Sequence, residues 1–514
     1  MARQINIEIH PDHADDKGIR AAIARSLKVS EDEIVGFVQD RRSIDARNRR
    51  VRLKLRLDVY LTGETIPSHD ATLVELPKLK GPPQVIVIGA GPAGLFAAWG
   101  LARAGIKAII FERGGDVRAR RPALAALNRN GTLDAENNYC FGEGGAGTFS
   151  DGKLYTRVKK GPTRTVLELL VGCGAPERIL VDTRPHIGTN RLPKVVQALR
   201  EYLIEAGVQF EFNSRVDGLV RNGRRLTGVR LGDGRSVLAP ATVLATGHSA
   251  RDIYLMLERE QVVIEAKPYA LGVRIEHPQD VIDKIQYGAL AGHQQLGAAP
   301  YSLKRTVDEI GVYSFCMCPG GFIVPATTQD GHLVVNGMSP SKRNSKFANS
   351  GFVVTVDEAV YGPGPLAGLE YQSKIERAAF QAGAGAYQAP AQRLVDFVEN
   401  RVSADLPECS YRPGLRSADL RAVLPPRIAD PMGDALRFFG SQRMRGYLSP
   451  DAVMVGVESR SSAPVRIPRE PESLESSSTP GLYPCGEGAG YAGGIVSAAL
   501  DGMKVASAIH RELG

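Results

Sequence analysis

Two cysteines lie close together in the segment FCMCPGG, and their spacing could support redox chemistry. Cys316 and Cys318 are two positions apart, so a strand would direct both thiols to one face. One interpretation is a redox-active pair, and the other is a pair of small apolar side chains in a core. The pattern favours the second, because C-x-C is an unusual disulfide spacing and no helix begins there to lower a thiol pKa. Two thiols alone do not make a zinc site, so we expect no metal.

An arginine and a histidine are further candidates for catalysis. Arg460, in the segment ESRSSAPVRI, could clamp a carboxylate with two hydrogen bonds. It could equally form a structural ion pair with Glu458 or another acid. His248 follows a glycine in the segment ATGHS, and it becomes a candidate if that glycine lies beside a bound cofactor.

The elements that must position these groups begin with VIVIGAGPAGLFAAWGLARAGIKAIIFER. VIVI predicts a buried parallel strand, and Gly89, Gly91 and Gly94 form the pattern G-x-G-x-x-G. These glycines permit a tight turn, a close approach to a pyrophosphate and close packing of helix on strand, with the phosphates at the helix N-terminus. Glu112 ends the next strand, where a carboxylate can accept from ribose hydroxyls. The segment predicts a dinucleotide site for FAD or NAD rather than NADP.

Other segments favour FAD over NAD. APATVLATGHS resembles the middle motif of the glutathione-reductase-type FAD superfamily, and GLYPCGEGAGYAGG resembles its C-terminal motif, whose acid contacts the ribityl chain. The glycine-rich stretch at residues 137–156 has the position that wraps the pyrophosphate and the flavin edge in that superfamily. The resemblance implies an FAD site made of Gly89, Gly91, Pro92, Ala93, Gly94, Glu112, Arg113, Gly145, Gly147, Thr148, Val216, Thr246, Gly247, Gly486, Glu487, Gly493, Gly494 and Ile495.

Further segments give a closer resemblance that covers nearly the whole chain. They are GGAGTFSDGKL, YSFCMCPGGFIVPATT, NGMSPSKRNSKFANSG, ESRSSAPVRIPR and PCGEGAGYAGGIVSAALDG. Together they resemble the uncharacterised FAD-dependent dehydrogenases, also described as NAD(FAD)-utilising dehydrogenases. The resemblance implies bound FAD and redox chemistry, and it supplies no set of catalytic residues.

The pattern along the chain predicts an α/β protein with several domains. Residues 1–62 predict a small α+β domain, ferredoxin-like in type, and residues 63–83 a linker. A Rossmann-type FAD-binding domain is predicted in two discontinuous segments, residues 84–261 and 456–514. Residues 262–455 then form an inserted α+β substrate domain.

Composition and charge indicate the class of protein, its location and the charge of its partners. With 43% hydrophobic and 23% charged residues, the 514-residue chain has the composition of a globular protein. We expect a cytoplasmic location, because six cysteines lack any repeated spacing and neither a signal peptide nor a membrane span stands out. A net charge of +8 favours anionic partners. The basic run at residues 41–56 indicates a solvated strand face more than an RNA-binding surface.

These features predict an FAD-dependent oxidoreductase that acts on an anionic small molecule between the FAD-binding and inserted domains. The chain has one dinucleotide fingerprint, so NAD(P)H would bind transiently or another electron partner would serve. Two alternatives stay open: an FAD-containing RNA-modification or RNA-binding protein, and a flavin monooxygenase.

Overall fold

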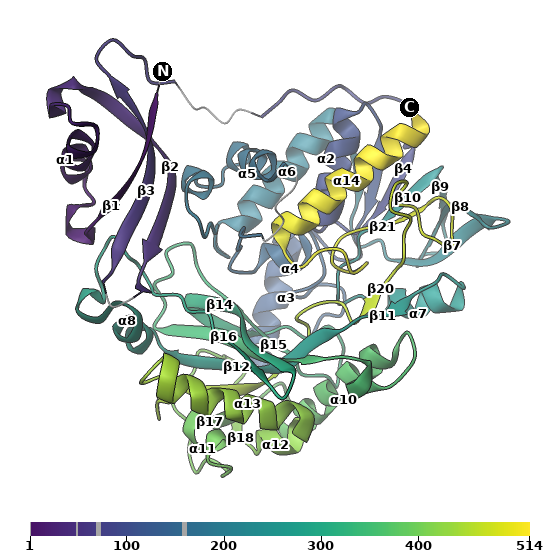
Figure 1. Cartoon of the computed structure of the whole chain (residues 1–514). Coiled ribbons are helices and arrows are strands. Elements are labelled where there is room, and N and C mark those ends of the chain that lie inside the picture. The colour runs from purple at the N-terminus through teal and green to yellow at the C-terminus, as the bar shows by residue number, and fades with distance from the viewer. Residues whose placement is uncertain (1, 48–49, 68–72, 157–161) are drawn as a thin grey trace.

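The computed structural model describes residues 2–47, 50–67, 73–156 and 162–514 (Figure 1). A small antiparallel sheet stands at the N-terminus, a parallel sheet follows it, and a larger, mostly antiparallel sheet comes from the middle of the chain. The α/β fold class with a Rossmann-type core is confirmed. In Figure 1 the C-terminal helix α14 (Ile495–Leu513) lies alongside α2 (Pro92–Arg103), although the two are far apart in sequence.

The N-terminal unit forms because its strands alternate apolar and charged residues. β3 (Arg52–Leu61) lies between β1 (Arg3–Ile9) and β2 (Ile34–Asp45), and α1 (Asp16–Leu27) packs on the apolar face. A complete ferredoxin-like fold has four strands and two helices. The described residues before β4 (Val85–Ile88) hold only these three strands and this one α-helix, so the ferredoxin-like assignment does not hold. The turn-rich residues after β3 contain no second helix and strand among those the structure describes.

The parallel sheet joins strands from both ends of the FAD-binding region. Its order is β21 (Leu482–Pro484), β10 (Ala241–Leu244), β4, β5 (Ala108–Phe111) and β6 (Gln209–Glu211). The buried β-branched run of β4 explains its central position. α14 packs closely on α2 because Gly502 carries no Cβ, which would come within 2.2 Å of the Ala93 carbonyl oxygen.

The remaining elements around this sheet are α3 (Val117–Asn130), α4 (Gly145–Thr148), α5 (Thr163–Gly172), α6 (Leu192–Ala206) and α7 (Arg251–Arg259). A separate antiparallel sheet contains β7 (Val216–Asn222), β8 (Arg225–Leu231) and β9 (Ser236–Leu238).

The large sheet belongs to the inserted region. Its order is β13 (Lys304–Val307), β14 (Ile310–Pro325), β16 (Phe347–Val356), β12 (Tyr269–Pro278), β19 (Val453–Glu458), β17 (Ala389–Arg393) and β18 (Leu415–Ser417), and β15 (Val335–Met338) pairs with β14. Its helices are α8 (Gln279–Tyr287), α9 (Glu358–Tyr361), α10 (Ala367–Ala382), α11 (Leu394–Val398), α12 (Leu420–Val423) and α13 (Pro426–Phe438). The predicted boundary after residue 455 falls inside β19, which pairs with β12 through Glu458. β11 (Glu265–Ala266) and β20 (Val465–Arg466) pair where the chain enters and leaves this region.

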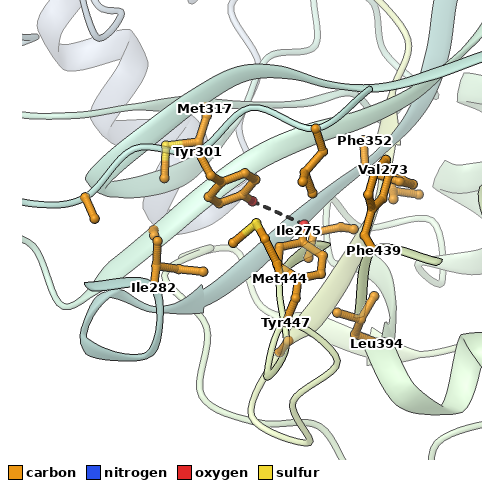
Figure 2. Close-up of a cluster of buried hydrophobic side chains, with 14 of the residues drawn as sticks. Val273, Ile275, Ile282, Tyr301, Met317, Phe352, Leu394, Phe439, Met444 and Tyr447 are labelled. Atoms are coloured by element: carbon orange, nitrogen blue, oxygen red, sulfur yellow. Dashed lines mark hydrogen bonds between the residues drawn. The ribbon is translucent and has the colours of Figure 1, made fainter. Parts of the chain in front are cut away.

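One face of the large sheet buries an aromatic and aliphatic core (Figure 2). Tyr301 and Tyr447 meet there through their hydroxyl groups at 3.3 Å, and Met317 of β14 points into the same cluster. Successive residues of a strand point to opposite faces. Met317 therefore occupies the core face, which leaves its two cysteine neighbours for the other side of the sheet.

Candidate active site

A cavity of about 450 Å³ opens between the parallel sheet and the large sheet. Ile88, Phe111 and Ala245, at the carboxyl ends of three parallel strands, line one side. Residues of β14 and β15 line the other side. Ligands of open α/β sheets bind at this edge. The predicted FAD-site residues along the wall are Gly89, Gly91, Pro92, Ala93, Glu112, Arg113, Gly145, Gly147, Val216, Thr246, Gly247, Glu487, Gly493, Gly494 and Ile495.

Three predicted FAD-site residues lie behind the wall and shape it. A Cβ on Gly94 would come within 2.0 Å of the Gly89 carbonyl oxygen, so this glycine lets α2 sit close to β4. The Thr148 hydroxyl donates to the Glu143 carbonyl at 2.8 Å and is buried. Gly486 has φ +76°, a conformation that favours glycine, and its amide donates to Asp501 at 2.8 Å.

Two glycines of the wall are not required by the protein's own packing. A Cβ built on Gly91 or Gly493 would meet no atom within 4 Å, and Gly91 has an ordinary φ of −76°. The side chain at either position would enter the cavity. Because the N-terminus of a helix attracts phosphate, the start of α2 at Gly91 suits a pyrophosphate. The cavity therefore fits an extended dinucleotide, for which side chains at these two positions would leave too little space.

Glu112 is buried and accepts three backbone hydrogen bonds. Its Oε1 accepts from the amides of Gly114 and Gly142 at 3.0 and 2.9 Å, and its Oε2 from Ala90 at 2.9 Å. A carboxylate has about four acceptor positions, which leaves room for a ribose hydroxyl on the cavity side. The next residue, Arg113, lines the cavity but directs its guanidinium to Glu136 and Asp252. Glu112 thus shapes the glycine loop as well as facing the cavity.

The two candidate cysteines lie at the wall supplied by the large sheet. Cys316 lines the cavity and is exposed, whereas Cys318 is fully buried beside it. The Lys153 ammonium lies 3.6 Å from the Cys316 sulfur and 3.4 Å from the Cys318 sulfur. A guanidinium nitrogen of Arg274 lies 3.7 Å from the Cys318 sulfur. The interpretation of the pair as two packed apolar side chains does not hold for Cys316, because Met317 fills the core instead.

A bulge in β14 explains how both sulfurs reach one lysine. The register with β16 shifts between Phe315 and Cys318, and Cys316 has φ +44°, a conformation that few residues other than glycine adopt. The Cys318 thiol then donates to the Cys316 carbonyl oxygen at 3.2 Å.

Charges around the pair favour a thiolate on Cys316. The neighbouring Cys318 thiol, as a donor to the Cys316 sulfur, and the cations of Lys153 and Arg274 hold the pKa of Cys316 well below its ordinary value, and desolvation of the sulfur by the surrounding atoms opposes this shift. Lys153 itself pairs with Asp151 at 3.2 Å, and Arg343 pairs with the same carboxylate at 2.8 Å.

Arg274 is fully buried and is held by other side chains of the large sheet. It donates to Glu458 at 2.7 Å, to Asn349 at 3.0 Å and to the Cys316 carbonyl oxygen at 2.8 Å. Burial raises the pKa of Glu458 to about 7, and Arg274 opposes that shift. The arginine therefore fixes the backbone of the bulge as well as one thiol.

The two remaining catalytic candidates differ in what they can do. Arg460 lines the cavity, but it forms a double hydrogen bond with Glu376 at 3.1 Å and another to the Thr328 hydroxyl at 2.6 Å. Of the two interpretations left open for Arg460, the structure shows the ion pair, with Glu376 rather than Glu458 as its partner. His248 also lines the cavity, and burial together with Arg460 lowers its pKa to about 4. His248 is therefore neutral at pH 7.

Glu487 faces the cavity from the C-terminal glycine-rich segment. Burial raises the pKa of Glu487 to about 7; Lys267 opposes the shift, and a charge on Cys316 adds to it. Glu487 and Cys316 line the same cavity.

Sequence reasoning missed Lys153 and Asp151 as members of this site. Lys153 and Asp151 stand in the glycine-rich stretch FSDGKLYT, so a charged pair beside the glycines was the available signal. Their partner Cys316 is 163 residues from Lys153, and no local pattern links the two.

Two family models match parts of the chain that carry the site. Residues 87–134 match an NAD(P)-binding Rossmann-like domain, and residues 268–461 match the description "FAD-dependent protein, C-terminal domain-like". Residues 1–60 match a domain of unknown function. Within the described ranges, no helix has both the length and the apolar character needed to cross a bilayer.

Several solved structures and curated proteins are similar to the chain. The structure of CtdE in complex with FAD is 12% identical, with 84% of each chain covered and a TM-score of 0.32. A geranylgeranyl bacteriochlorophyll reductase-like protein of Thermoplasma acidophilum is 13% identical, with 84% of this chain and 78% of that chain covered and a TM-score of 0.35. The probable electron transfer flavoprotein-quinone oxidoreductase YdiS of Escherichia coli is 29% identical over 37% of this chain and 42% of its own.

A relative of full length is described as an uncharacterized protein of Clostridium beijerinckii. It is 41% identical over 99% of this chain and 98% of its own length. The match to the FAD-dependent C-terminal domain and the fit of the cavity identify FAD as the cofactor. The chain belongs to the same family as this Clostridium beijerinckii protein.

Proposed function

We propose that the protein is an FAD-dependent dehydrogenase or reductase, of the NAD(FAD)-utilising type, that acts on an anionic small molecule. One observation carries the proposal: a single cavity has a glycine-lined end at the start of α2 and a cationic, thiol-bearing wall at the large sheet. The first end suits the cofactor, and the second presents chemistry to whatever lies beside it. When bound, FAD supplies transfer of two electrons.

The protein's own residues would hold and orient the reactants. Gly91 and Gly493 would leave room for the cofactor, and Glu112 holds the amide of Ala90 in the glycine loop. Lys153, partly exposed beside Cys316, supplies a cation for an anionic substrate. Neutral His248, in the loop after β10, can accept or donate a hydrogen bond in the cavity.

Anaerobic reduction of the purified holoprotein tests the proposal. NADH and NADPH are mixed with the protein in a stopped-flow instrument, and loss of the oxidised flavin spectrum is followed. The reduced protein is then screened against small anionic oxidants for reoxidation. A protein that neither carries FAD nor takes it up would contradict the proposal, as would a flavin that no donor reduces in repeated screens.

The same preparation separates the monooxygenase alternative. A monooxygenase consumes oxygen in proportion to a hydroxylated or otherwise oxygenated product, whereas a dehydrogenase turns over with an oxygen-independent acceptor. We favour the dehydrogenase because the thiol wall offers a partner that does not need oxygen.

The RNA-binding alternative draws on the basic run of the N-terminal unit. Several of its cations already have acidic neighbours: Arg56 pairs with Asp40, Lys54 with Glu8 at 2.8 Å, and Arg47 with Asp45 at 2.6 Å. Residues 48 and 49 of the run lie outside the described residues. The first two pairs join neighbouring strands and the third is local to the end of β2, and cross-strand pairs are typical of a solvated strand face.

A further inference from the structure

We propose that Cys316 and Cys318 form a redox-active dithiol that exchanges two electrons with FAD in the same cavity. This inference rests on the proposed function, since it names an electron partner for the flavin within the chain. Oxidation of the Cys316 thiolate and the Cys318 thiol breaks one S–H bond, forms one S–S bond and releases two electrons and one proton. These, with a second proton from solvent, reduce FAD to its dihydro form, and the reverse transfer restores the thiolate and the thiol.

The two cysteines differ in exposure, and this difference assigns them different roles. Cys316 is exposed and lines the cavity, so it can meet a second reactant, whereas Cys318 is fully buried behind it. Redox cysteines are commonly accessible thiolates that stand next to a resolving thiol. Cys316 is the accessible member here, and Cys318 is the resolving member.

The bulge in β14 removes the usual objection to a C-x-C disulfide. In a regular strand, residues two apart point the same way but are held apart by the extended backbone. Here Cys316 has a left-handed φ of +44°, and the ladder to β16 skips a position between Phe315 and Cys318. Both sulfurs lie within 3.6 Å of one Lys153 ammonium as a result.

The cations of this cluster outnumber its carboxylates. Lys153 and Arg343 share Asp151, and Arg274 is paired with Glu458, so three cations face two carboxylates and a thiolate would balance the third. Attack on a disulfide requires a thiolate, and a nearby cation stabilises one. Lys153 and Arg274 are positioning residues for the pair.

Electron counting on the holoprotein tests the proposal. Oxidised wild-type protein is titrated with dithionite without oxygen, and the electrons consumed per FAD are measured. We expect wild type to take up twice as many electrons per FAD as Cys316→Ser or Cys318→Ser, because each variant has lost the disulfide. Cys173→Ala, a change in the core beside the parallel sheet, should match wild type.

A readout independent of the flavin is the mass of the thiol-bearing peptide. After oxidation, unfolding and alkylation, the wild-type peptide should lack two alkyl groups and regain them after reduction. If FAD is bound and reducible but both cysteines stay alkylatable after full oxidation, the dithiol is excluded and the proposed function stands. If no FAD binds, the proposed function itself fails, whatever the state of the thiols.

Discussion

Replacing Gly91 by alanine tests whether the cavity holds FAD as its geometry indicates. The added Cβ meets no protein atom within 4 Å, and the φ of −76° suits any residue. The apoprotein should therefore fold and melt like wild type. The methyl group would stand where the pyrophosphate approaches the first amides of α2.

The expected loss of affinity follows from the hydrogen bonds at that helix terminus. A hydrogen bond to a charged group contributes about 1.5–3 kcal/mol. Displacing the phosphates from two such amides would cost about 3 kcal/mol or more, which is roughly a hundredfold in Kd. Gly493→Ala should act in the same direction, because its Cβ also enters the open cavity.

Gly94→Ala, three residues further on and within α2, is the matched control. Its Cβ would come within 2.0 Å of the Gly89 carbonyl oxygen, so α2 must shift from β4. Overpacking of this kind costs about 1–3 kcal/mol, so this apoprotein should melt at a lower temperature. The assay combines thermal melting of the apoproteins with FAD titration followed by flavin fluorescence. Wild-type FAD affinity in Gly91→Ala, or a melting loss equal to that of Gly94→Ala, would refute the reasoning.

Three further substitutions test the charges of the site. Glu376→Gln leaves two buried arginines without their carboxylate and should destabilise the protein by about 3–5 kcal/mol in thermal melts at pH 7. The pKa of Glu376 is lowered to about 2, so wild type should keep its full extra stability over the variant above pH 4.5, the ordinary pKa of a glutamate. This extra stability should fade as the pH falls toward 2, and a stability difference that is equal at all pH values would contradict the prediction. The pKa of Glu487 is raised to about 7, so the folded wild-type apoprotein loses stability as this group ionises between pH 4.5 and 7. The free energy of unfolding of Glu487→Gln apoprotein should therefore rise relative to wild type over that range, and a difference that does not change with pH would count against this prediction. Lys153→Gln should slow alkylation of Cys316 about tenfold at pH 7, because the thiolate loses roughly 1.4 kcal/mol of attraction to the ammonium, and the rate should recover at alkaline pH. The control Lys304→Gln changes an exposed lysine and should leave the rate unchanged.

The sequence was sufficient to predict most of the glycine-rich lining at one end of the cavity. Gly89, Gly91 and Glu112 belong to a strand–loop–helix pattern that can be recognised from a short stretch of sequence. The C-terminal glycines resemble a motif that follows this pattern, in the same order, in the FAD superfamily. The ferredoxin-like assignment failed because a three-stranded unit with one helix begins with the same pattern.

The thiol end depended on contacts that no local pattern contains. Strand alternation correctly placed Cys316 and Cys318 on one face, but the sequence alone did not show that Met317 would fill the core. The bulge and the approach of Lys153 come from segments far apart in the chain. The partners of Arg460 and Arg274 were likewise set by which strands and helices became neighbours.

Arg42 of β2 links the N-terminal unit to both larger parts of the molecule. The backbone of Arg42 exchanges hydrogen bonds with Val181 and Thr183 of the FAD-binding region at 3.0 Å each, and its guanidinium donates to the Gln295 carbonyl of the inserted region at 2.7 Å. The unit is thus a strut that bridges the two larger parts of the molecule. Deleting it to test nucleic-acid binding would also release that strut, so charge substitutions on its exposed strand face are the cleaner experiment.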